Sequence, residues 1–267
     1  MDFSASPDAT IGVFDSGIGG LSVLRALRVR IPHAHLHYVA DSAHAPYGDR
    51  SVEEVVERAR QITRHLLDSG ARLIMAACNT ATTAAIHALR AEWPATPFVG
   101  VEPGIKPAVL RSPSGRIGVL ATRRTIASER MQTLVALHAS HCQILLQPCP
   151  GLADAIESGS EDTGAIDVLL KGYCAPLLEA QVDTVVLGCT HYPFVADRIQ
   201  AVMGPEVALI DTADAVAQRA QSLWPQHSAR ATSFARLRLE TTGDPHVLST
   251  MAQRWLPCTE DAHGISR

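Results

Sequence analysis

The chain has 267 residues, of which 46% are hydrophobic and 19% are charged, and its formal net charge at pH 7 is -4. This composition is typical of a globular enzyme with room for one large α/β domain or two smaller ones. A mildly acidic chain without a basic stripe argues against a dedicated nucleic-acid binder, and no apolar run reaches the roughly 18 residues of a membrane span. Residues 1–10 lack the basic start and apolar stretch of a secretion signal, so we expect a cytoplasmic protein with reduced cysteines.

Short strands rich in Val, Ile and Leu alternate along the chain with longer helical stretches. The predicted strands cover residues 10–15, 35–40, 72–77, 97–101, 116–121, 143–147, 183–188, 206–211 and 235–241. The predicted helices cover residues 19–30, 51–68, 79–92, 123–138, 163–179, 193–202, 211–223 and 244–256. This alternation is typical of parallel sheets that are covered by helices on both faces.

The two halves of the chain resemble each other in sequence. Ile11–Ser16 (IGVFDS) is similar to Ile117–Thr122 (IGVLAT), and each segment is followed, at a similar distance, by an apolar strand that ends at a cysteine. These cysteines are Cys78 and Cys189. Because open parallel sheets bind ligands at the carboxyl ends of their strands, we expect both thiols at ligand-binding positions. If the two halves face each other, the thiols lie on opposite sides of one cleft.

Two opposed thiols are suited to the inversion of an α-carbon. Inversion removes a proton from one face and returns a proton to the other, so one group must be ionised and the other protonated. A thiol can fill both roles, since its unperturbed pKa of about 8.5 lies near neutral pH. Cys78 and Cys189 each precede a predicted helix start, whose amides favour a thiolate and can hold a substrate carboxylate. The remaining cysteines lack this context and are interpreted as small buried hydrophobic residues: Cys142, Cys149, Cys174 and Cys258.

The motifs around these cysteines resemble those of the glutamate racemases, in the aspartate/glutamate racemase superfamily. The resemblance covers nearly the whole chain and is sharpest in FDSGIGGL (14–21), PYG (46–48), ACNTA (77–81), GCTHYP (188–193) and TGDP (242–245). It implies an α/β fold with two similar flavodoxin-like parallel-sheet domains that face each other across an active-site cleft. The implied first domain has residues 1–100 and 210–267 and carries Cys78, and the implied second domain has residues 101–209 and carries Cys189.

The resemblance also implies roles for individual residues. The implied catalytic residues are Cys78, Cys189, Asp15, His191 and Glu157. Asp15 and Ser16 match positions that hold the substrate amine and support the first cysteine, while His191 and Glu157 match residues that assist the second. The implied substrate-binding residues are Asp15, Ser16, Tyr47, Gly48, Asn79, Thr80, Thr122, Thr125, Thr190 and His191. From its place at a strand-to-helix turn alone, the default interpretation of Asp15 is a cap on the helix that starts near Gly19, and this role does not exclude a contact with the substrate.

The implied activity is the interconversion of L- and D-glutamate without a cofactor or a metal, which supplies D-glutamate for peptidoglycan, and hence for cell-wall biogenesis and cell shape. His191 favours glutamate, because aspartate racemases carry an acidic residue at the matching position. An aspartate or hydantoin racemase and a non-catalytic binding module remain alternatives. The expected partner is the small-molecule substrate glutamate, with no nucleic acid and no membrane. We also expect a homodimer, although the sequence itself does not give the oligomeric state.

The glycine-rich turn and the two lysines of the chain bear on the presence of a cofactor. The glycine-rich turn at residues 17–22 has Ser22 where a dinucleotide motif has its third glycine, and it contains no Gly-Lys-Ser/Thr. Pyridoxal phosphate would need a Schiff-base lysine, and neither Lys106 nor Lys171 lies in a phosphate-binding context. A reaction without a cofactor fits these features better.

A run of alternating histidines is the remaining signal. His33, His35 and His37 share one face of a predicted strand. A metal site is conceivable there, but we expect a half-exposed strand face, since no nearby cysteine or carboxylate completes a ligand set.

Overall fold

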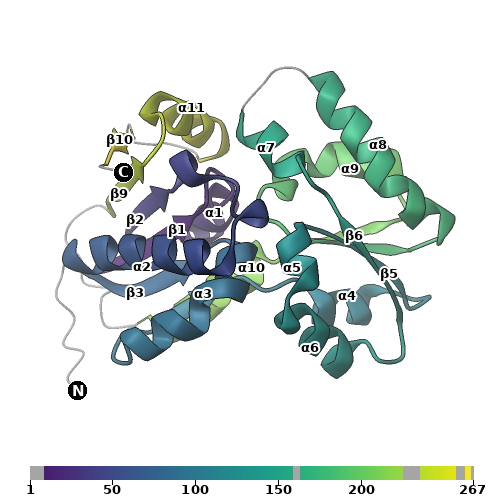
Figure 1. Cartoon of the computed structure of the whole chain (residues 1–267), viewed down its shortest axis with the longest axis horizontal. Coiled ribbons are helices and arrows are strands. Elements are labelled where there is room, and N and C mark those ends of the chain that lie inside the picture. The colour runs from purple at the N-terminus through teal and green to yellow at the C-terminus, as the bar shows by residue number, and fades with distance from the viewer. Residues whose placement is uncertain (1–8, 159–162, 225–234, 257–261, 266–267) are drawn as a thin grey trace. The chain divides into compact units, whose positions relative to one another are not determined.

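The structure, a computed structural model, describes residues 9–158, 163–224, 235–256 and 262–265. The N-terminal residues 1–8 and Cys258 therefore lie outside the described residues. The chain divides into two compact units, and we call Met1–Val101 with Ala213–Arg267 unit 1 and Glu102–Thr212 unit 2 (Figure 1). Within the described ranges, every helix falls short of the length and apolar character that a bilayer crossing requires.

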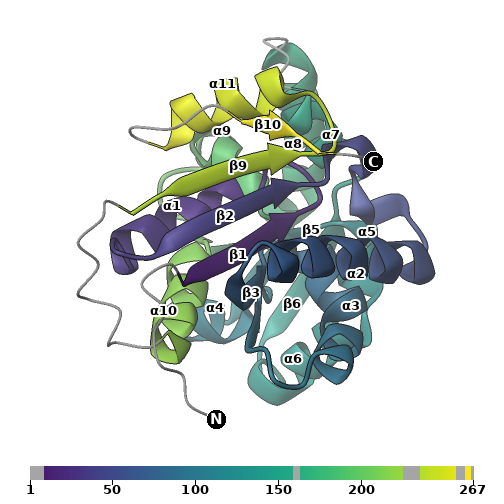
Figure 2. The same ribbon diagram turned by 90° about the vertical axis from the view of Figure 1, so that its left-hand side faces the viewer.

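Unit 1 is built on a six-stranded sheet with the order β10-β9-β2-β1-β3-β4. All its strand pairs are parallel, so the strands run side by side in one direction (Figure 2). The strands are β1 (Thr10–Asp15), β2 (His35–Ala40), β3 (Ala71–Ala76), β4 (Phe98–Gly100), β9 (Leu237–Thr241) and β10 (His263–Gly264).

Helices cover the sheet of unit 1. They are α1 (Leu21–Arg30), α2 (Val52–Asp68), α3 (Asn79–Glu92), α10 (Ala213–Leu223) and α11 (Pro245–Trp255), with 3-10 turns η1 (Ser42–His44) and η2 (Tyr47–Asp49). α2 begins at a capping box, in which Ser51 and Glu54 each accept a hydrogen bond from the other's backbone N–H. Apolar residues of α2 and α3, such as Leu66 and Ala85, share a core with Phe14 and Ile74 of the sheet. α1 packs against α10 and α11.

Unit 2 is built on a four-stranded parallel sheet with the order β6-β5-β7-β8. Its strands are β5 (Arg116–Ala121), β6 (Gln143–Pro148), β7 (Thr184–Leu187) and β8 (Ala208–Ile210). Its helices are α4 (Ile105–Arg111), α5 (Arg123–Ala127), α6 (Glu129–His138), α7 (Leu152–Glu157), α8 (Thr163–Glu179) and α9 (Ala196–Met203), with the 3-10 turn η3 (Tyr192–Val195). One core includes residues of α4 and α6, and a second includes residues of α7, α8 and α9.

The internal repeat of the sequence is a repeat of topology. The order β2-β1-β3-β4 in unit 1 matches the order β6-β5-β7-β8 in unit 2, and both follow the start of the flavodoxin order. Cys78 follows the third strand of the first set and Cys189 follows the third strand of the second. The prediction of two similar parallel-sheet α/β domains is therefore confirmed, and unit 1 extends the common plan with β9 and β10.

Some predicted elements differ from those observed. The helix predicted at residues 123–138 is two helices, α5 and α6, because Ser128 is extended (φ -72, ψ 144) and its hydroxyl accepts the backbone N–H of Met131 at the start of α6. The helix predicted at residues 193–202 starts with the 3-10 turn η3 before α9. Helices α4 and α7 and strand β10 were not predicted.

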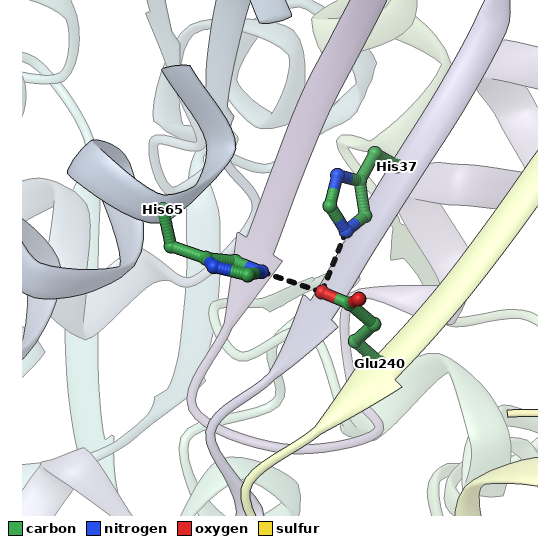
Figure 3. Close-up of side chains that lie close together, drawn as sticks. All are labelled: His37, His65 and Glu240. Carbon is green, nitrogen blue, oxygen red and sulfur yellow. Dashed lines mark hydrogen bonds and ion pairs between the residues drawn. The ribbon is translucent and has the colours of Figure 1, made fainter. Parts of the chain in front are cut away.

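The face of β2 that carries His35 and His37 is buried, so the prediction of a half-exposed face was wrong. His35 is 7% and His37 2% exposed, because β2 lies between β1 and β9 and its Val39 belongs to the core formed with α2. His33 precedes the strand and is exposed. The expectation that no carboxylate lies nearby was also wrong, since Glu240 Oε2 of β9 is 2.7 Å from His37 Nε2 (Figure 3).

Candidate active site

In unit 1, Cys78 lies at the point where β3 ends and α3 begins. It is the N-cap residue of α3, and its Sγ accepts the backbone N–H of Ala81 at 3.4 Å. The first amides of a helix need an acceptor, and here the sulfur fills the role that a serine or aspartate oxygen usually fills. Cys78 Sγ also lies 3.7 Å from Ser16 Oγ, to which the thiol donates. Cys78 is 5% exposed and also borders the apolar core that α2 and α3 form with the sheet.

Asp15 and Ser16 form the turn after β1, next to Cys78. Asp15 is fully buried, and its Oδ1 accepts the backbone N–H of Gly17 at 2.8 Å and the hydroxyl of Ser16 at 3.4 Å. The N-cap of α1 is Gly20, without a side-chain hydrogen bond. The contacts of the Asp15 carboxylate with Ser16 and Gly17 lie within the turn that carries Ser16 towards Cys78, before the N-cap position of α1.

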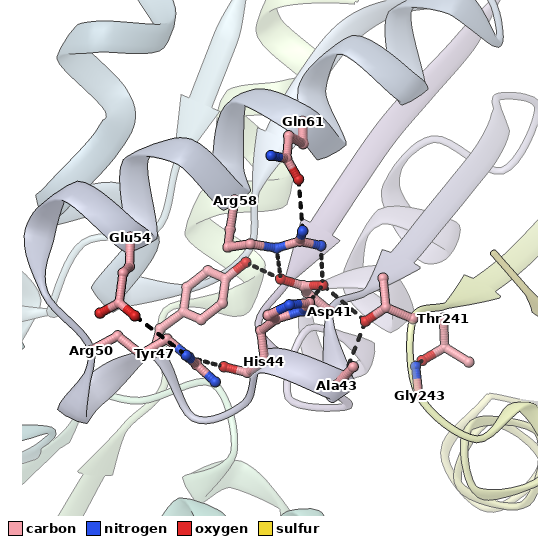
Figure 4. A network of polar contacts seen from close by, with 11 residues as sticks. Asp41, Ala43, His44, Tyr47, Arg50, Glu54, Arg58, Gln61, Thr241 and Gly243 are labelled. Atoms are coloured by element: carbon pink, nitrogen blue, oxygen red, sulfur yellow. Dashed lines mark hydrogen bonds and ion pairs between the residues drawn. The ribbon is translucent and has the colours of Figure 1, made fainter. Parts of the chain in front are cut away.

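Tyr47 and Gly48 are buried in a loop that is fixed by an aspartate (Figure 4). The Tyr47 hydroxyl donates to Asp41 Oδ2 at 2.6 Å, and burial together with the charge of Asp41 raises the pKa of Tyr47 well above its ordinary value. Asp41, fully buried, also accepts Nε and Nη2 of Arg58 at 3.0 and 2.8 Å and the hydroxyl of Thr242 at 2.8 Å. The loop is thereby joined to α2 and to the residues after β9.

Asn79 and Thr80 form the first turn of α3 directly after Cys78, and they are only 3% and 2% exposed. Within the described residues, Asn79 Oδ1 is buried without a hydrogen-bond donor. A buried acceptor without a donor is rare in native proteins. Its position beside Cys78 makes Asn79 a candidate contact for a ligand.

In unit 2, Cys189 follows β7 and belongs to a linear set of three polar side chains. Cys189 Sγ is 3.8 Å from His191 Nδ1, and His191 Nε2 is 2.6 Å from Glu157 Oε2. Glu157 is the last residue of α7. Burial alone would lower the pKa of His191, but the hydrogen bonds and charges of Cys189 and Glu157 outweigh it and raise that pKa well above its ordinary value. A histidine held as an imidazolium stabilises a thiolate beside it.

Three predicted threonines lie in unit 2: Thr122 and Thr190 just after strands, and Thr125 in α5. Thr122 follows β5 and caps α5, because its Oγ1 accepts the backbone N–H of Thr125 at 3.2 Å while its hydroxyl donates to Thr125 Oγ1 at 3.0 Å. Thr190 is 5% exposed and stands between Cys189 and His191. In the common strand plan, Thr122 takes the place that Ser16 has after β1.

The other described cysteines lie in or against the apolar cores of unit 2. Cys149 and Cys174 are buried, and burial raises the pKa of both thiols, that of Cys174 to about 11. Cys142 is partly buried against the core of α4 and α6. The prediction of a small buried hydrophobic residue is confirmed for Cys149 and Cys174, which belong to the core of α7, α8 and α9.

The family model for Asp/Glu/Hydantoin racemase matches residues 21–220. The chain belongs to this racemase family. A glutamate racemase of Ectopseudomonas mendocina is 48% identical over 237 residues, which cover 88% of this chain and 90% of the relative. A glutamate racemase of Pseudomonas aeruginosa is 47% identical over 85% of this chain and 84% of its own length.

Solved racemase structures have the same fold. A glutamate racemase isoform from Bacillus anthracis aligns with a TM-score of 0.86 at 31% identity, covering 98% of both chains. Escherichia coli glutamate racemase, solved in complex with L-glutamate and the activator UDP-MurNAc-ala, aligns with a TM-score of 0.85 at 31% identity, covering 97% of this chain and 99% of that one.

Each unit of this racemase-family chain gathers its own group of predicted site residues. Unit 1 holds Asp15, Ser16, Tyr47, Gly48, Cys78, Asn79 and Thr80, and unit 2 holds Thr122, Thr125, Glu157, Cys189, Thr190 and His191. Reasoning from the sequence missed Asp41 as the residue that holds Tyr47. The available signal was its position directly after a strand whose carboxyl end lies at the same sheet edge as Asp15.

Proposed function

We propose that this protein is a glutamate racemase that interconverts L- and D-glutamate by proton transfer through Cys78 and Cys189, without a cofactor. The observation that carries the proposal is the repeated placement of one thiol after the third strand of two equivalent sheets, each beside polar groups that handle protons. Close relatives named glutamate racemase over most of the chain support the choice of substrate.

In the proposed reaction, the two sulfurs act on opposite faces of the α-carbon. A thiolate removes the α-proton, the electron pair of the broken C–H bond is delocalised into the substrate carboxylate, and the thiol on the other face donates its proton to the carbon. The two cysteines exchange protonation states in each turnover, and the reverse reaction restores them. The pKa of a thiol near neutral pH allows the same residue to serve as base in one direction and acid in the other.

The surrounding residues have to stabilise the carbanion. A turnover of about 10 per second corresponds to a barrier of about 16 kcal/mol, which a thiolate alone cannot reach with so weak a carbon acid. We assign the substrate ammonium to Asp15 and Ser16, because a buried carboxylate keeps an amine protonated. We assign the substrate carboxylates to the loop and helix-start residues Tyr47, Gly48, Asn79, Thr80, Thr122, Thr125 and Thr190, whose amides and hydroxyls are oriented before the reaction.

His191 and Glu157 are proposed to hold the proton balance at Cys189. Their contacts of 3.8 and 2.6 Å form a carboxylate–imidazole–thiol series, and the raised pKa of His191 favours the imidazolium form. An imidazolium beside Cys189 stabilises the thiolate form that removes the α-proton. This stabilisation ends when the sulfur takes up the proton and becomes a neutral thiol. Removal of either partner would therefore act on the Cys189 half-reaction first.

The proposal extends to the biological setting. D-glutamate is a precursor of peptidoglycan, so the enzyme would act in cell-wall biogenesis and cell shape, in the cytoplasm where that precursor is used. We propose a homodimer as the working assembly and the division of the fold at residues 100 and 210 as the functional domain boundary.

The proposal is tested with purified protein and L-glutamate, without an added cofactor. The circular dichroism of the amino acid is expected to decay to zero, and in D₂O deuterium is expected at Cα. Cys78→Ala and Cys189→Ala should each abolish racemisation, whereas Cys142→Ala should not. Full activity in either active-site variant would reject the mechanism.

Chiral chromatography of other amino acids decides between members of the family. Faster inversion of aspartate or a hydantoin than of glutamate would overturn the substrate assignment. If the α-proton of none of these compounds exchanges with solvent deuterium, the protein would instead be a binding module.

A further inference from the structure

A second group of chemically active side chains lies within unit 1, apart from Cys78. His37 of β2, His65 in the last turn of α2 and Glu240 of β9 converge on one point (Figure 3). Glu240 Oε2 is 2.7 Å from His37 Nε2 and 2.6 Å from His65 Nε2. One nitrogen or oxygen atom from each residue lies within 4.8 Å of the other two.

We propose that His37, His65 and Glu240 form a binding site for a divalent transition-metal ion, represented by Zn²⁺. Two imidazole nitrogens and one carboxylate oxygen are a donor set that zinc accepts, with bonds of about 2.0–2.2 Å. Imidazole ligands favour zinc and its transition-metal neighbours over Mg²⁺ and Ca²⁺, which prefer oxygen. The proposal does not depend on the racemase function.

The burial of the group supports ligation. His37 and Glu240 side chains are 3% and 2% exposed, so two donors stand in a dry and rigid part of the sheet, fixed by the pairing of β2 with β9. His65 is 36% exposed and lies near the end of a helix, so its ring can adjust. Tetrahedral ligands at about 2.0 Å from a metal are about 3.3 Å apart. The present contacts of 2.7 Å to His37 and 2.6 Å to His65 would each need to lengthen by roughly 0.6 Å, so the Glu240 carboxylate as well as the His65 ring would shift on binding.

The second oxygen of Glu240 is held by another residue. Arg238 Nη2 forms an ion pair with Glu240 Oε1, which leaves Oε2 to face both imidazoles. Hydrogen bonds to the outer atoms of ligands are a regular feature of metal sites, since they fix the ligand orientation. The Arg238 side chain is 54% exposed, so water screens the repulsion between its charge and a bound cation.

A pocket lies beside the site and reaches His65, although His37 and Glu240 do not line it. His65 lines a pocket of about 440 Å³ together with Arg58, Gln61, Thr242 and Ile265. A tetrahedral zinc with three protein ligands completes its shell with water or another small ligand, and this pocket would supply it. Metal bound here would join β2, α2 and β9, three elements that the chain brings together from distant positions.

The test is a titration of the chelator-stripped, full-length protein with ZnCl₂, followed by isothermal calorimetry. One zinc per chain is expected, and both His65→Gln and Glu240→Gln should weaken its binding by more than about 10-fold, the lower limit for changes even to outer-shell residues. His33→Gln is the matched control, because His33 is an exposed histidine next to the same strand. Far-ultraviolet circular dichroism verifies that each variant is folded. If Glu240→Gln does not fold, the zinc affinity of His65→Gln, a change at a half-exposed residue, tests the proposal.

Cobalt substitution separates this site from the free thiols. A Co²⁺ adduct with visible d–d bands and no thiolate-to-cobalt charge-transfer band is expected, and His65→Gln should remove those bands. The proposal is overturned by a charge-transfer band, which would indicate cysteine ligation, by affinities that are equal in wild type, His65→Gln and Glu240→Gln, or by the absence of binding in the wild type.

Discussion

The two units place the sulfurs of Cys78 and Cys189 in the same way but surround them differently. Cys78 lies beside an uncharged hydroxyl and a backbone amide, those of Ser16 and Ala81. Cys189 lies beside His191, whose imidazole is in turn held by the carboxylate of Glu157. The repeated strand order fixes where each sulfur stands, while side chains from elsewhere in each unit determine which polar groups lie beside it.

The two units also differ just after the second strand of the common plan, β2 in unit 1 and β6 in unit 2. Asp41 follows β2 in unit 1, whereas Cys149 follows β6 at the equivalent place in unit 2. Asp41 anchors the loop that carries Tyr47, while Cys149 is a buried thiol in an apolar core. One unit thus uses this position for a polar scaffold and the other for hydrophobic packing. Equivalent positions of a shared fold therefore have different surroundings in the two units, and four experiments test what those surroundings do.

The largest effect is expected from Cys78→Ser and Cys189→Ser. A hydroxyl is a far weaker acid than a thiol, so racemisation should fall about 10²- to 10⁴-fold. Each variant keeps one intact thiol, so α-proton exchange in D₂O should survive for one enantiomer in the first variant and for the opposite enantiomer in the second. Nuclear magnetic resonance of separate L- and D-glutamate samples measures it, with Cys142→Ser as control. Loss of exchange for the same enantiomer in both variants would contradict two opposed thiols.

Asp41→Asn is expected to destabilise unit 1 by about 3 kcal/mol, because it leaves Arg58 without its fully buried partner. The urea midpoint of unfolding measures the change, and KM for glutamate should rise as the Tyr47 loop loosens. Glu57→Gln on the same helix is the control, since an exposed ion pair contributes less than about 1 kcal/mol. Equal midpoints for the two variants would remove Asp41 from its scaffold role.

Glu157→Gln is expected to lower kcat by about 10-fold, the effect of roughly one pKa unit at a proton-transfer partner. Loss of the carboxylate lowers the pKa of His191, so the imidazolium form is lost at a lower pH and the alkaline limb of the kcat profile should move to lower pH. Asp154→Asn on the same helix should leave the profile in place. An unchanged profile in Glu157→Gln would make this residue a structural contact only.

The smallest effect is expected at Asp183, at the start of β7. Burial raises the pKa of this carboxyl, but hydrogen bonds from Ser112, Ser114 and Thr184 outweigh it and hold the pKa at about 2, below the ordinary 3.8. Because the folded-state pKa is depressed, the stabilisation is present above pH 3.8 and lost as the pH falls through about 2. Asp183→Asn should therefore lower stability by about 1 kcal/mol at pH 7.

Urea unfolding of both proteins at pH 7 and at acidic pH tests the direction of this pH dependence. The gap between wild type and Asp183→Asn should close as the pH falls towards 2. A gap of constant size would assign the loss to the shape of the side chain and not to its charge.

Much of the fold could be predicted from hydrophobic patterning. Strands β1, β2 and β5 have the predicted bounds, because turn residues follow each of these runs of strand-forming residues. The break at Ser128 was missed, although serine followed by an acidic residue is a start signal for a helix. The short helices α4 and α7 span only seven and six residues, too few for a helical period to be read.

The two candidate sites also differ in how far they could be predicted from the sequence. Cys78 and Cys189 could be recognised because each stands in a local motif at the end of a strand. The contact of Glu240 with His37 could not, because these residues are 203 positions apart and meet only through the pairing of β9 with β2. Local sequence predicts elements and the residues at their ends, whereas the neighbours of a strand depend on topology.

The pairing of β2 with β9 also has a consequence for synthesis on the ribosome. At about 5–20 residues per second, the 203 positions between His37 and Glu240 take roughly 10 to 40 seconds to translate. Throughout that time one side of β2 has open amides and carbonyls, the kind of edge along which nascent chains aggregate. The four strands of unit 2 all precede β9 in the chain, so their sheet can be completed sooner. A ribosome that stalls before β9 therefore leaves a chain in which the sheet of unit 2 is complete and the edge of β2 is unpaired and prone to aggregation.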